Sequence, residues 1–223
     1  MIKLDRITKS YLLSGGNRHY VFKDLSFTFR EGANIGLIGP NGAGKSTLMN
    51  ILGGIDIPDS GRVITNKSIS WPVGLSGGLQ GSLTARDNVK FVARVYGYRA
   101  AELAEKVRYV EEFAEIGEYF DEPIKTFSSG MRARVTFGLS MAFDFDYYLV
   151  DEAGAVGDAN FRKKSMAVYK QKLQSGNVIL VSHNMSEVRS LCDHIVVIYG
   201  GNAHVFDSVE EGIKMYEEIR TVQ

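Results

Sequence analysis

The sequence has 223 residues, of which 44% are hydrophobic and 23% are charged, proportions that are ordinary for a soluble globular protein. Lysine plus arginine and aspartate plus glutamate number 26 each, so no net charge favours nucleic acid or an anionic membrane surface. No apolar run approaches the roughly 18 residues of a membrane-spanning helix, and the N-terminus carries no hydrophobic signal sequence. We therefore expect one cytosolic domain, 1–223, that reaches a membrane only through a partner protein.

Hydrophobic periodicity predicts alternating strands and helices along most of the chain. Strands are predicted at 2–11, 20–29, 34–38, 57–64 (after a turn), 143–152, 176–182 and 194–200. Helices are predicted from about residue 45, at 84–97, around 103–113, within 126–143, and at 161–174, 184–192 and 208–220. This alternation predicts a mostly parallel sheet covered by helices, with a helical block at 84–142 inserted between strands. The single cysteine, Cys192, lies on an apolar helical face, so we expect a small buried hydrophobe.

The stretch Gly39–Thr47, GPNGAGKST, matches the phosphate-loop pattern G-x-x-x-x-G-K-[ST]. A short apolar strand precedes it and a helix follows it, which is the context that this motif requires. The glycines let backbone N–H groups converge on an anion, and the start of the helix adds its positive partial charge. We expect nucleotide contacts from the whole loop: Gly39, Pro40, Asn41, Gly42, Ala43, Gly44, Lys45, Ser46 and Thr47.

Particular roles follow from the chemistry of the side chains near this loop. Lys45 is expected to reach the outer phosphates, and the Ser46 hydroxyl is expected to bind Mg²⁺. Asp151 and Glu152 end a buried strand, at the edge of the sheet where ligands bind in such folds. We expect Asp151 to hold Mg²⁺ and Glu152 to act as the general base toward the attacking water. His183 follows another buried strand and is expected to contact phosphate at the same edge.

Two further features suggest contacts with nucleotide. Ser128, Ser129 and Gly130 open a predicted helix, whose free N–H groups make a second anion site suited to another copy of the chain. Tyr11 and Tyr20 precede the phosphate loop, and either ring could stack on a base. Composition alone favours ordinary packing of both rings and does not choose between them.

Together these motifs resemble the ATP-binding subunit of an ABC transporter over essentially the whole chain. GPNGAGKS resembles the family's Walker A motif, YYLVDE its Walker B motif with the catalytic Glu152, and Ser182-His183 its switch histidine. FSSGM matches the family's LSGGQ signature at Ser128 and Gly130, and departs from it at Phe127, Ser129 and Met131. The resemblance implies an α/β P-loop NTPase of the ABC type. It would have a mostly parallel core sheet, an N-terminal antiparallel β portion, a core of 1–83 and 143–223, and a helical subdomain at about 84–142.

The resemblance also implies roles that the residues alone do not. Asp158 ends AVGD at the place of the family's D-loop, and Tyr11 sits where the family usually has its adenine-stacking aromatic residue. Gln80 is the candidate Q-loop glutamine and metal contact, although it lies closer to the following LTARDN segment than in most members. The apolar, glycine-rich stretch at 71–83 falls where the family couples to its permease, so it is expected either to line that groove or to pack onto the core.

Within the family, SSGM, AVGD and GLQGSLTARDN most resemble the capsular-polysaccharide exporters of Gram-negative bacteria. The resemblance implies an ATP- and Mg²⁺-dependent dimer on the cytoplasmic face of the inner membrane, bound to an integral membrane permease and powering export of a lipid-linked capsular polysaccharide. Alternatives are an exporter of O-antigen or teichoic acid and a non-transport ABC ATPase acting on DNA or ribosomes. A regulatory GTPase is disfavoured because Asn66-Lys67 is not followed by the aspartate that guanine requires.

Overall fold

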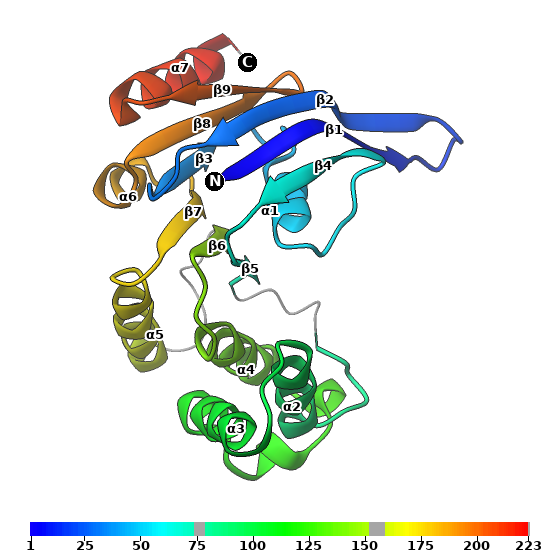
Figure 1. Cartoon of the computed structure of the whole chain (residues 1–223), viewed down its shortest axis with the longest axis vertical. Coiled ribbons are helices and arrows are strands. Elements are labelled where there is room, and N and C mark those ends of the chain that lie inside the picture. The colour runs from blue at the N-terminus through cyan, green and yellow to red at the C-terminus, as the bar shows by residue number, and fades with distance from the viewer. Residues whose placement is uncertain (74–78, 152–158, 223) are drawn as a thin grey trace. The chain divides into compact units, whose positions relative to one another are not determined.

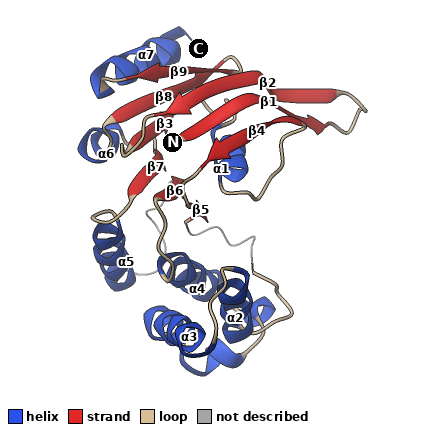
Figure 2. Ribbon diagram, viewed as in Figure 1, coloured by secondary structure: helices blue, strands red, loops and turns tan. Residues whose placement is uncertain are grey.

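The structure is a computed structural model that describes residues 1–73, 79–151 and 159–222, and Figures 1 and 2 trace these elements along the chain. The chain forms two compact units. The first comprises Met1–Pro72, Phe145–Glu152 and Gly176–Gln223, and the second comprises Val73–Asp144 and Ala153–Ser175. The helical block predicted at 84–142 falls within the second unit, which also includes the helix that follows residue 158.

A three-stranded antiparallel sheet forms the N-terminal part of the first unit, with the strand order β2-β1-β4. Its strands are β1 (Ile2–Leu12), β2 (Arg18–Phe29) and β4 (Ser60–Thr65). The alternating pattern of β1 predicts this arrangement, because one face of the strand is buried and the other is solvated. Ile2, Leu4 and Ile7 are buried in the core on that face. The predicted antiparallel β portion is therefore present.

The second sheet of this unit has six strands in the order β5-β6-β7-β3-β8-β9. They are β5 (Ile69–Pro72), β6 (Tyr147–Asp151), β7 (Asn177–Val181), β3 (Ile35–Ile38), β8 (His194–Tyr199) and β9 (Asn202–Phe206). All neighbouring strands are parallel except β9, which pairs antiparallel with β8. The central strands are buried on both faces, as continuous apolar runs predict. The predicted mostly parallel sheet is confirmed.

Helix α1 (Lys45–Leu52) packs against this sheet and shares a core with both sheets. Leu48 and Met49 of α1 lie in one cluster with Phe22 of the first sheet and Leu149 of the second. The other helices of the unit are α6 (Met185–Leu191) and α7 (Val209–Val222), and α7 packs on β8 and β9. Because α1 begins at the phosphate loop, this core fixes the loop relative to the central strands.

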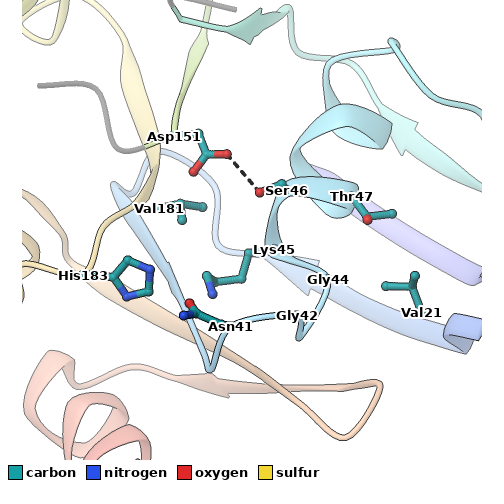
Figure 3. A pocket seen from close by; sticks show the side chains of 10 residues that line it. All are labelled: Val21, Asn41, Gly42, Gly44, Lys45, Ser46, Thr47, Asp151, Val181 and His183. Atoms are coloured by element: carbon teal, nitrogen blue, oxygen red, sulfur yellow. Dashed lines mark hydrogen bonds between the residues drawn. The ribbon is translucent and has the colours of Figure 1, made fainter. Parts of the chain in front are cut away.

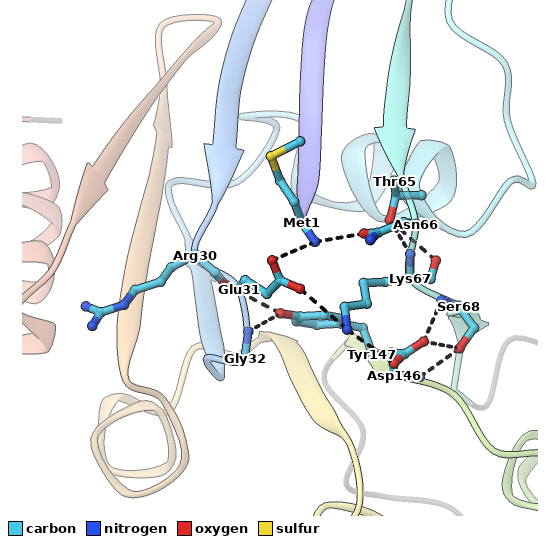
Figure 4. Close-up of polar contacts among 10 residues, drawn as sticks. All are labelled: Met1, Arg30, Glu31, Gly32, Thr65, Asn66, Lys67, Ser68, Asp146 and Tyr147. Carbon is cyan, nitrogen blue, oxygen red and sulfur yellow. Dashed lines mark hydrogen bonds and ion pairs between the residues drawn. The ribbon is translucent and has the colours of Figure 1, made fainter.

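A polar network joins the amino-terminal ends of β1 and β6 (Figure 4). The Met1 amine donates to Asn66 Oδ1 at 3.0 Å and lies 3.2 Å from a Glu31 carboxylate oxygen. Lys67 lies between the carboxylates of Glu31 and Asp146, at 3.5 and 3.7 Å. Asn66 and Lys67 are thus engaged at the end of β6 opposite to Asp151. This placement does not favour a guanine-binding role for Asn66 and Lys67.

The second unit contains the helices α2 (Ala85–Val95), α3 (Ala100–Ala114), α4 (Ser129–Met141) and α5 (Ala159–Lys172). The Thr84 side chain caps α2 by accepting from the Asp87 N–H. Short 3₁₀ turns at Gly117–Asp121 and Ile124–Thr126 lead into α4. The Arg86 guanidinium donates to both Glu111 and Asp121, and these hydrogen bonds raise the pKa of Arg86.

Three details differ from the sequence predictions or sharpen them. The strand predicted at 143–152 starts only at Tyr147, because Phe143 packs beside Tyr96 in the second unit. Trp71 belongs to β5 rather than to a loop, and its ring meets Phe145 edge-on at 5.5 Å between centroids. Cys192 is buried, and burial raises the pKa of its thiol to about 12, which agrees with its predicted role as a hydrophobe.

None of the helices in the described ranges combines the length and the apolar character that crossing a bilayer would require.

Candidate functional site

The loop between β3 and α1 has a backbone that only glycine adopts readily. Gly39, Gly42 and Gly44 have φ values of 154°, 77° and 101°. A methyl group on Gly39 would lie 2.3 Å from the Ile198 carbonyl oxygen of β8. The loop can therefore curl tightly above the sheet only because these positions lack a side chain.

Lys45, the first residue of α1, folds back over this loop. Its ammonium donates to the carbonyl oxygens of Gly39 at 2.8 Å and Pro40 at 2.9 Å, and the residue is only 8% exposed. A buried ammonium needs such partners, because an uncompensated charge away from water is costly. The lysine is thus already held at the centre of the loop, where a phosphate group can compete for its N–H donors.

Ser46 and Asp151 meet although they are far apart in the sequence. The Ser46 hydroxyl donates to Asp151 Oδ2 at 3.1 Å (Figure 3). The pairing arises because α1 begins beside the carboxyl end of β6, two positions from β3 in the sheet. The Ser46 and Asp151 oxygen atoms, at this spacing, are suitable ligands for a hard cation such as Mg²⁺, which usually binds one or two carboxylates plus substrate phosphates. Within the described ranges no group of three or more His, Cys, Asp and Glu side chains could hold a metal by itself.

A pocket of about 480 Å³ opens above the loop (Figure 3). Its lining consists of Val21, Asn41, Gly42, Gly44, Lys45, Ser46, Thr47, Asp151, Val181 and His183. Eight of these ten residues are predicted site residues, so the structure brings the predicted loop, acid and histidine together. Val21 and Val181 were not predicted, since an apolar residue in a strand carries no signal that distinguishes a pocket wall from the core.

His183 reaches the pocket from the turn after β7. The side chain of Asn184 caps α6 by accepting from the N–H groups of Ser186 and Glu187. The Ser182 hydroxyl donates to the carboxylate of Glu187 at 2.7 Å and accepts from the Asn184 N–H. These bonds fix the turn, and His183 is left exposed on the pocket side.

The structure separates the two candidate aromatic residues. The phenol of Tyr11 donates to Asp56 Oδ2 at 2.8 Å and lies near the side chain of Thr47, which lines the pocket. Tyr20 lies instead in a separate hollow beside the turn at Gly200 and Gly201. Burial is the largest influence on the phenol of Tyr11, and its pKa is raised.

Of the predicted site residues within the described ranges, four belong to the second unit, whereas the pocket-lining residues belong to the first. The Ser128 side chain caps α4 by accepting from the Met131 N–H at 3.2 Å, so Ser129 and Gly130 form the first turn of that helix as predicted. A methyl group on Gly130 would meet nothing closer than Ser128 Oγ at 3.9 Å. Gln80 is exposed, and its backbone N–H donates to Asn88 Oδ1. The predicted residues Glu152 and Asp158 lie outside the described residues.

A family model described as ABC transporter matches residues 22–155, which is more than half of the chain. The chain belongs to the ABC transporter family. It therefore has the ATP-binding domain of that family and is an ATP hydrolase coupled to transport.

Similar proteins span nearly the whole chain. The polysialic acid transport ATP-binding protein KpsT of Escherichia coli is 54% identical over 225 residues, covering 98% of this chain and 99% of its own. The capsule polysaccharide export ATP-binding protein CtrD of Neisseria meningitidis serogroup B is 40% identical, covering 98% of this chain and 100% of its own. Proteins named for export of teichoic acids or O-antigen also match, at 34% and 36% identity.

The fold matches solved structures as well. A dimeric, post-hydrolysis structure of the ATP-binding cassette MJ0796 bound to ADP and Pi superposes with a TM-score of 0.69. The two chains are 26% identical, and the match covers 92% of this chain and 97% of the other. The predicted ABC-type fold is confirmed.

Gly42→Ala and Gly44→Ala form a matched pair, because both glycines have positive φ but differ in the space around them. Alanine at either position costs about 1–2 kcal/mol for the left-handed backbone. At Gly44 the methyl group would also lie 2.4 Å from Val21 Cγ1 and 2.6 Å from Phe22 Cζ, whereas a methyl group on Gly42 would have no atom of the described residues within 4 Å. We expect Gly44→Ala to unfold at a lower temperature and to bind ATP more weakly than Gly42→Ala, by calorimetry. Equal values for the two variants would contradict this reading of the loop.

Proposed function

We propose that this chain powers export of a capsular, lipid-linked polysaccharide across the inner membrane, through a separate integral membrane permease. The observation that carries the proposal is its similarity to a polysialic acid transport protein over nearly the full length of both chains. Exporters of teichoic acids and O-antigen are less similar and are matched over only 88% and 86% of their own length. Teichoic acids and O-antigen are therefore the alternative cargo.

In this proposal the protein works at the cytoplasmic face of the inner membrane, where the permease holds it as a peripheral subunit. The names of the similar proteins, which refer to transport and export, support a membrane partner. The equal numbers of acidic and basic residues give no support to nucleic acid as a partner. In the apolar stretch 71–83, Trp71 packs on Phe145 and Val73 is buried, so among the described residues of that stretch Leu79–Leu83 are left for permease contact.

The nucleotide is proposed to bind in the pocket above the phosphate loop. Its phosphates would accept hydrogen bonds from the loop N–H groups and would draw the Lys45 ammonium away from the Gly39 and Pro40 carbonyl oxygens. Tyr11 is proposed to stack on the adenine, since its phenol lies near Thr47, which lines the pocket. Mg²⁺ fits between the Ser46 hydroxyl and the Asp151 carboxylate. When bound, Mg²⁺ would neutralise charge that develops on the phosphates.

The remaining predicted site residues are proposed to act in ATP hydrolysis and in dimer formation. Glu152 is proposed as the general base that takes a proton from the attacking water, and His183 as the contact to the outer phosphate. Gln80 is proposed to contact the metal or the water. Each nucleotide would lie between the phosphate loop of one copy and Ser128, Ser129 and Gly130 of a second copy, with Asp158 at the dimer interface. The dimeric state of the similar cassette supports this arrangement.

Glu152→Gln should separate ATP binding from ATP turnover. An amide keeps the size of the side chain but cannot accept the proton of water, so we expect turnover to fall by roughly a hundredfold or more. ATP affinity, measured by calorimetry, should stay close to that of the unmodified chain. Lys45→Ala serves as the contrast, because it should weaken binding itself through loss of a charged phosphate contact. Wild-type turnover in Glu152→Gln would contradict the role of Glu152.

Gly130→Asp should act only on the dimer. The space around Gly130 accepts a side chain, so the isolated chain should fold and bind ATP. Across the proposed interface the carboxylate would face the phosphates of the partner's nucleotide and repel them. We expect no ATP-dependent dimer by light scattering in the Glu152→Gln background.

Gly130→Asn is the matched control for that variant, because it has the same size without the charge. It should form more dimer than Gly130→Asp at every ATP concentration. A Gly130→Asp dimer as abundant as that of the parent protein would remove the proposed role of Gly130.

Rescue of capsule export tests the cargo. In a Gram-negative strain that makes a lipid-linked capsule but lacks its own export ATPase, this chain and its permease should return capsule to the cell surface. With Glu152→Gln the polymer should accumulate inside the cells, as shown by antibody binding to lysed but not intact cells. Failure to rescue the capsule strain, with rescue of an O-antigen export mutant instead, would show that the cargo is wrong.

A further inference from the structure

A buried charge pair lies at the base of the β1–β2 hairpin, next to Tyr11. The Lys9 ammonium is only 7% exposed, and it donates to Asp56 Oδ1 at 2.5 Å and to the Ile57 carbonyl oxygen at 2.8 Å. The second oxygen of the same carboxylate, Asp56 Oδ2, accepts from the Tyr11 hydroxyl at 2.8 Å. One carboxylate therefore holds two side chains of β1, and neither Lys9 nor Asp56 belongs to the motifs recognised in the sequence.

Asp56 is in turn fixed to the helix that carries the phosphate loop. The backbone N–H groups of Ile55 and Asp56 donate to the Asn50 carbonyl oxygen in α1, at 2.9 and 3.2 Å. The Ile57 N–H donates to Asp56 Oδ1 at 2.8 Å and orients the carboxylate. The phenol of Tyr11 is thus linked through Asp56 to the end of α1, and it also lies near the Thr47 side chain at the start of that helix.

The electrostatics keep this arrangement intact at neutral pH. Burial alone would raise the pKa of Asp56, but hydrogen bonds from Lys9 and Tyr11 outweigh it and leave the pKa lowered. The hydrogen bond to Asp56 is the largest influence on Lys9 and raises its pKa. Asp56 therefore remains an ionised acceptor, and hydrogen bonds to a charged acceptor are stronger than those between neutral groups.

The Lys9 ammonium also lies over the Tyr11 ring, 5.0 Å from its centroid. A cation in this position is attracted by the ring and covers one of its faces. Tyr11 is nevertheless 41% exposed, which leaves surface on this residue for another flat group. The Lys9–Asp56 pair thus determines both the position of the Tyr11 ring and the face of the ring that is open to a stacking group.

We propose that Asp56 is a positioning residue for nucleotide recognition, which holds the Tyr11 ring in fixed register with the phosphate loop. Tyr11, Asp56 and α1 then form one rigid unit. The separation of the Tyr11 ring from the phosphate loop in this unit matches the distance from base to phosphates in a nucleoside triphosphate. This inference rests on the proposed stacking of adenine on Tyr11. It adds that the affinity for the base depends on a carboxylate that does not touch the nucleotide.

The test compares ATP with inorganic tripolyphosphate, which carries the phosphates without the base. Asp56→Asn keeps the shape of the side chain but removes its charge. We expect calorimetric titration with Mg²⁺ present to show an ATP affinity about tenfold weaker, as expected for a lost hydrogen bond to a charged group. The affinity for tripolyphosphate should change by less than about twofold, because the phosphate loop is untouched. Equal weakening of both ligands would indicate a merely structural ion pair and would overturn the inference.

Tyr11→Phe provides an independent test that does not depend on the folding of Asp56→Asn. It keeps the ring but removes the hydroxyl that Asp56 holds, so it should also weaken ATP binding without weakening tripolyphosphate binding. In the Tyr11→Phe background, Asp56→Asn should weaken ATP by less than about twofold further, since contacts that act through one another are not additive. A full additional effect in the double variant, or an unchanged ATP affinity in Tyr11→Phe, would contradict the inference.

Tyr11→Ala separates this inference from the proposed function. If Tyr11→Ala loses its preference for ATP over tripolyphosphate but Asp56→Asn retains it, only the role of Asp56 is wrong. If Tyr11→Ala keeps the full preference, the stacking role of Tyr11 is itself wrong.

Discussion

The Lys45 ammonium and the curled loop beneath it are the constraint on which the site depends. The positive charge is buried, and it donates hydrogen bonds to the carbonyl oxygens of Gly39 and Pro40. The loop can place those oxygens there only because glycine accepts the backbone angles at positions 39, 42 and 44. The same curl directs N–H groups outward to an anion. A triphosphate that replaces the carbonyl oxygens as partner of Lys45 gains a charged contact without leaving a charge unpaired.

The sheet supplies the rest of the pocket through its strand order. β3 lies between β7 and β8, and β6 lies beyond β7, so the carboxyl ends of β3, β6 and β7 meet at one edge. Gly39, Asp151 and His183 each follow or end one of these strands. Helix α1 then brings Ser46 to Asp151, while its far end carries Asp56 toward Tyr11. One short helix therefore connects the sites proposed for the metal, the phosphates and the base.

Much of this could be predicted from the sequence, because the motifs combine a fixed spacing with a fixed chemical role. The phosphate loop, Asp151 and His183 follow apolar strands whose parallel pairing places their ends together. Other features have no such signal. β5 ends in Pro72, which cannot donate to a sheet, and β9 reads as polar because it is an edge strand, so neither strand was predicted. The roles of Lys9 and Asp56 depend on a contact across 47 residues of sequence that no spacing rule anticipates.

The choice between Tyr11 and Tyr20 shows the same limit of sequence reasoning. Both are strand aromatics of similar exposure, and Tyr11 is distinguished by its hydrogen bond to Asp56 and by the nearby side chain of Thr47. Resemblance to a family pointed to the same residue, but the physical reason lies in the tertiary contacts. The open space around Gly130 is likewise visible only in the structure, where a methyl group at this position would lie 3.9 Å from Ser128 Oγ and no closer to any other described residue beyond its neighbours in the helix.

A crystal structure of the chain with ATP and Mg²⁺ is the most direct test of the central claim, which is that Lys45 exchanges its carbonyl partners for phosphate. The account predicts that the Lys45 ammonium leaves the Gly39 and Pro40 carbonyl oxygens and contacts the outer phosphates, with Mg²⁺ bound between Ser46 and Asp151. A nucleotide bound elsewhere, with Lys45 still on the two carbonyl oxygens, would contradict it.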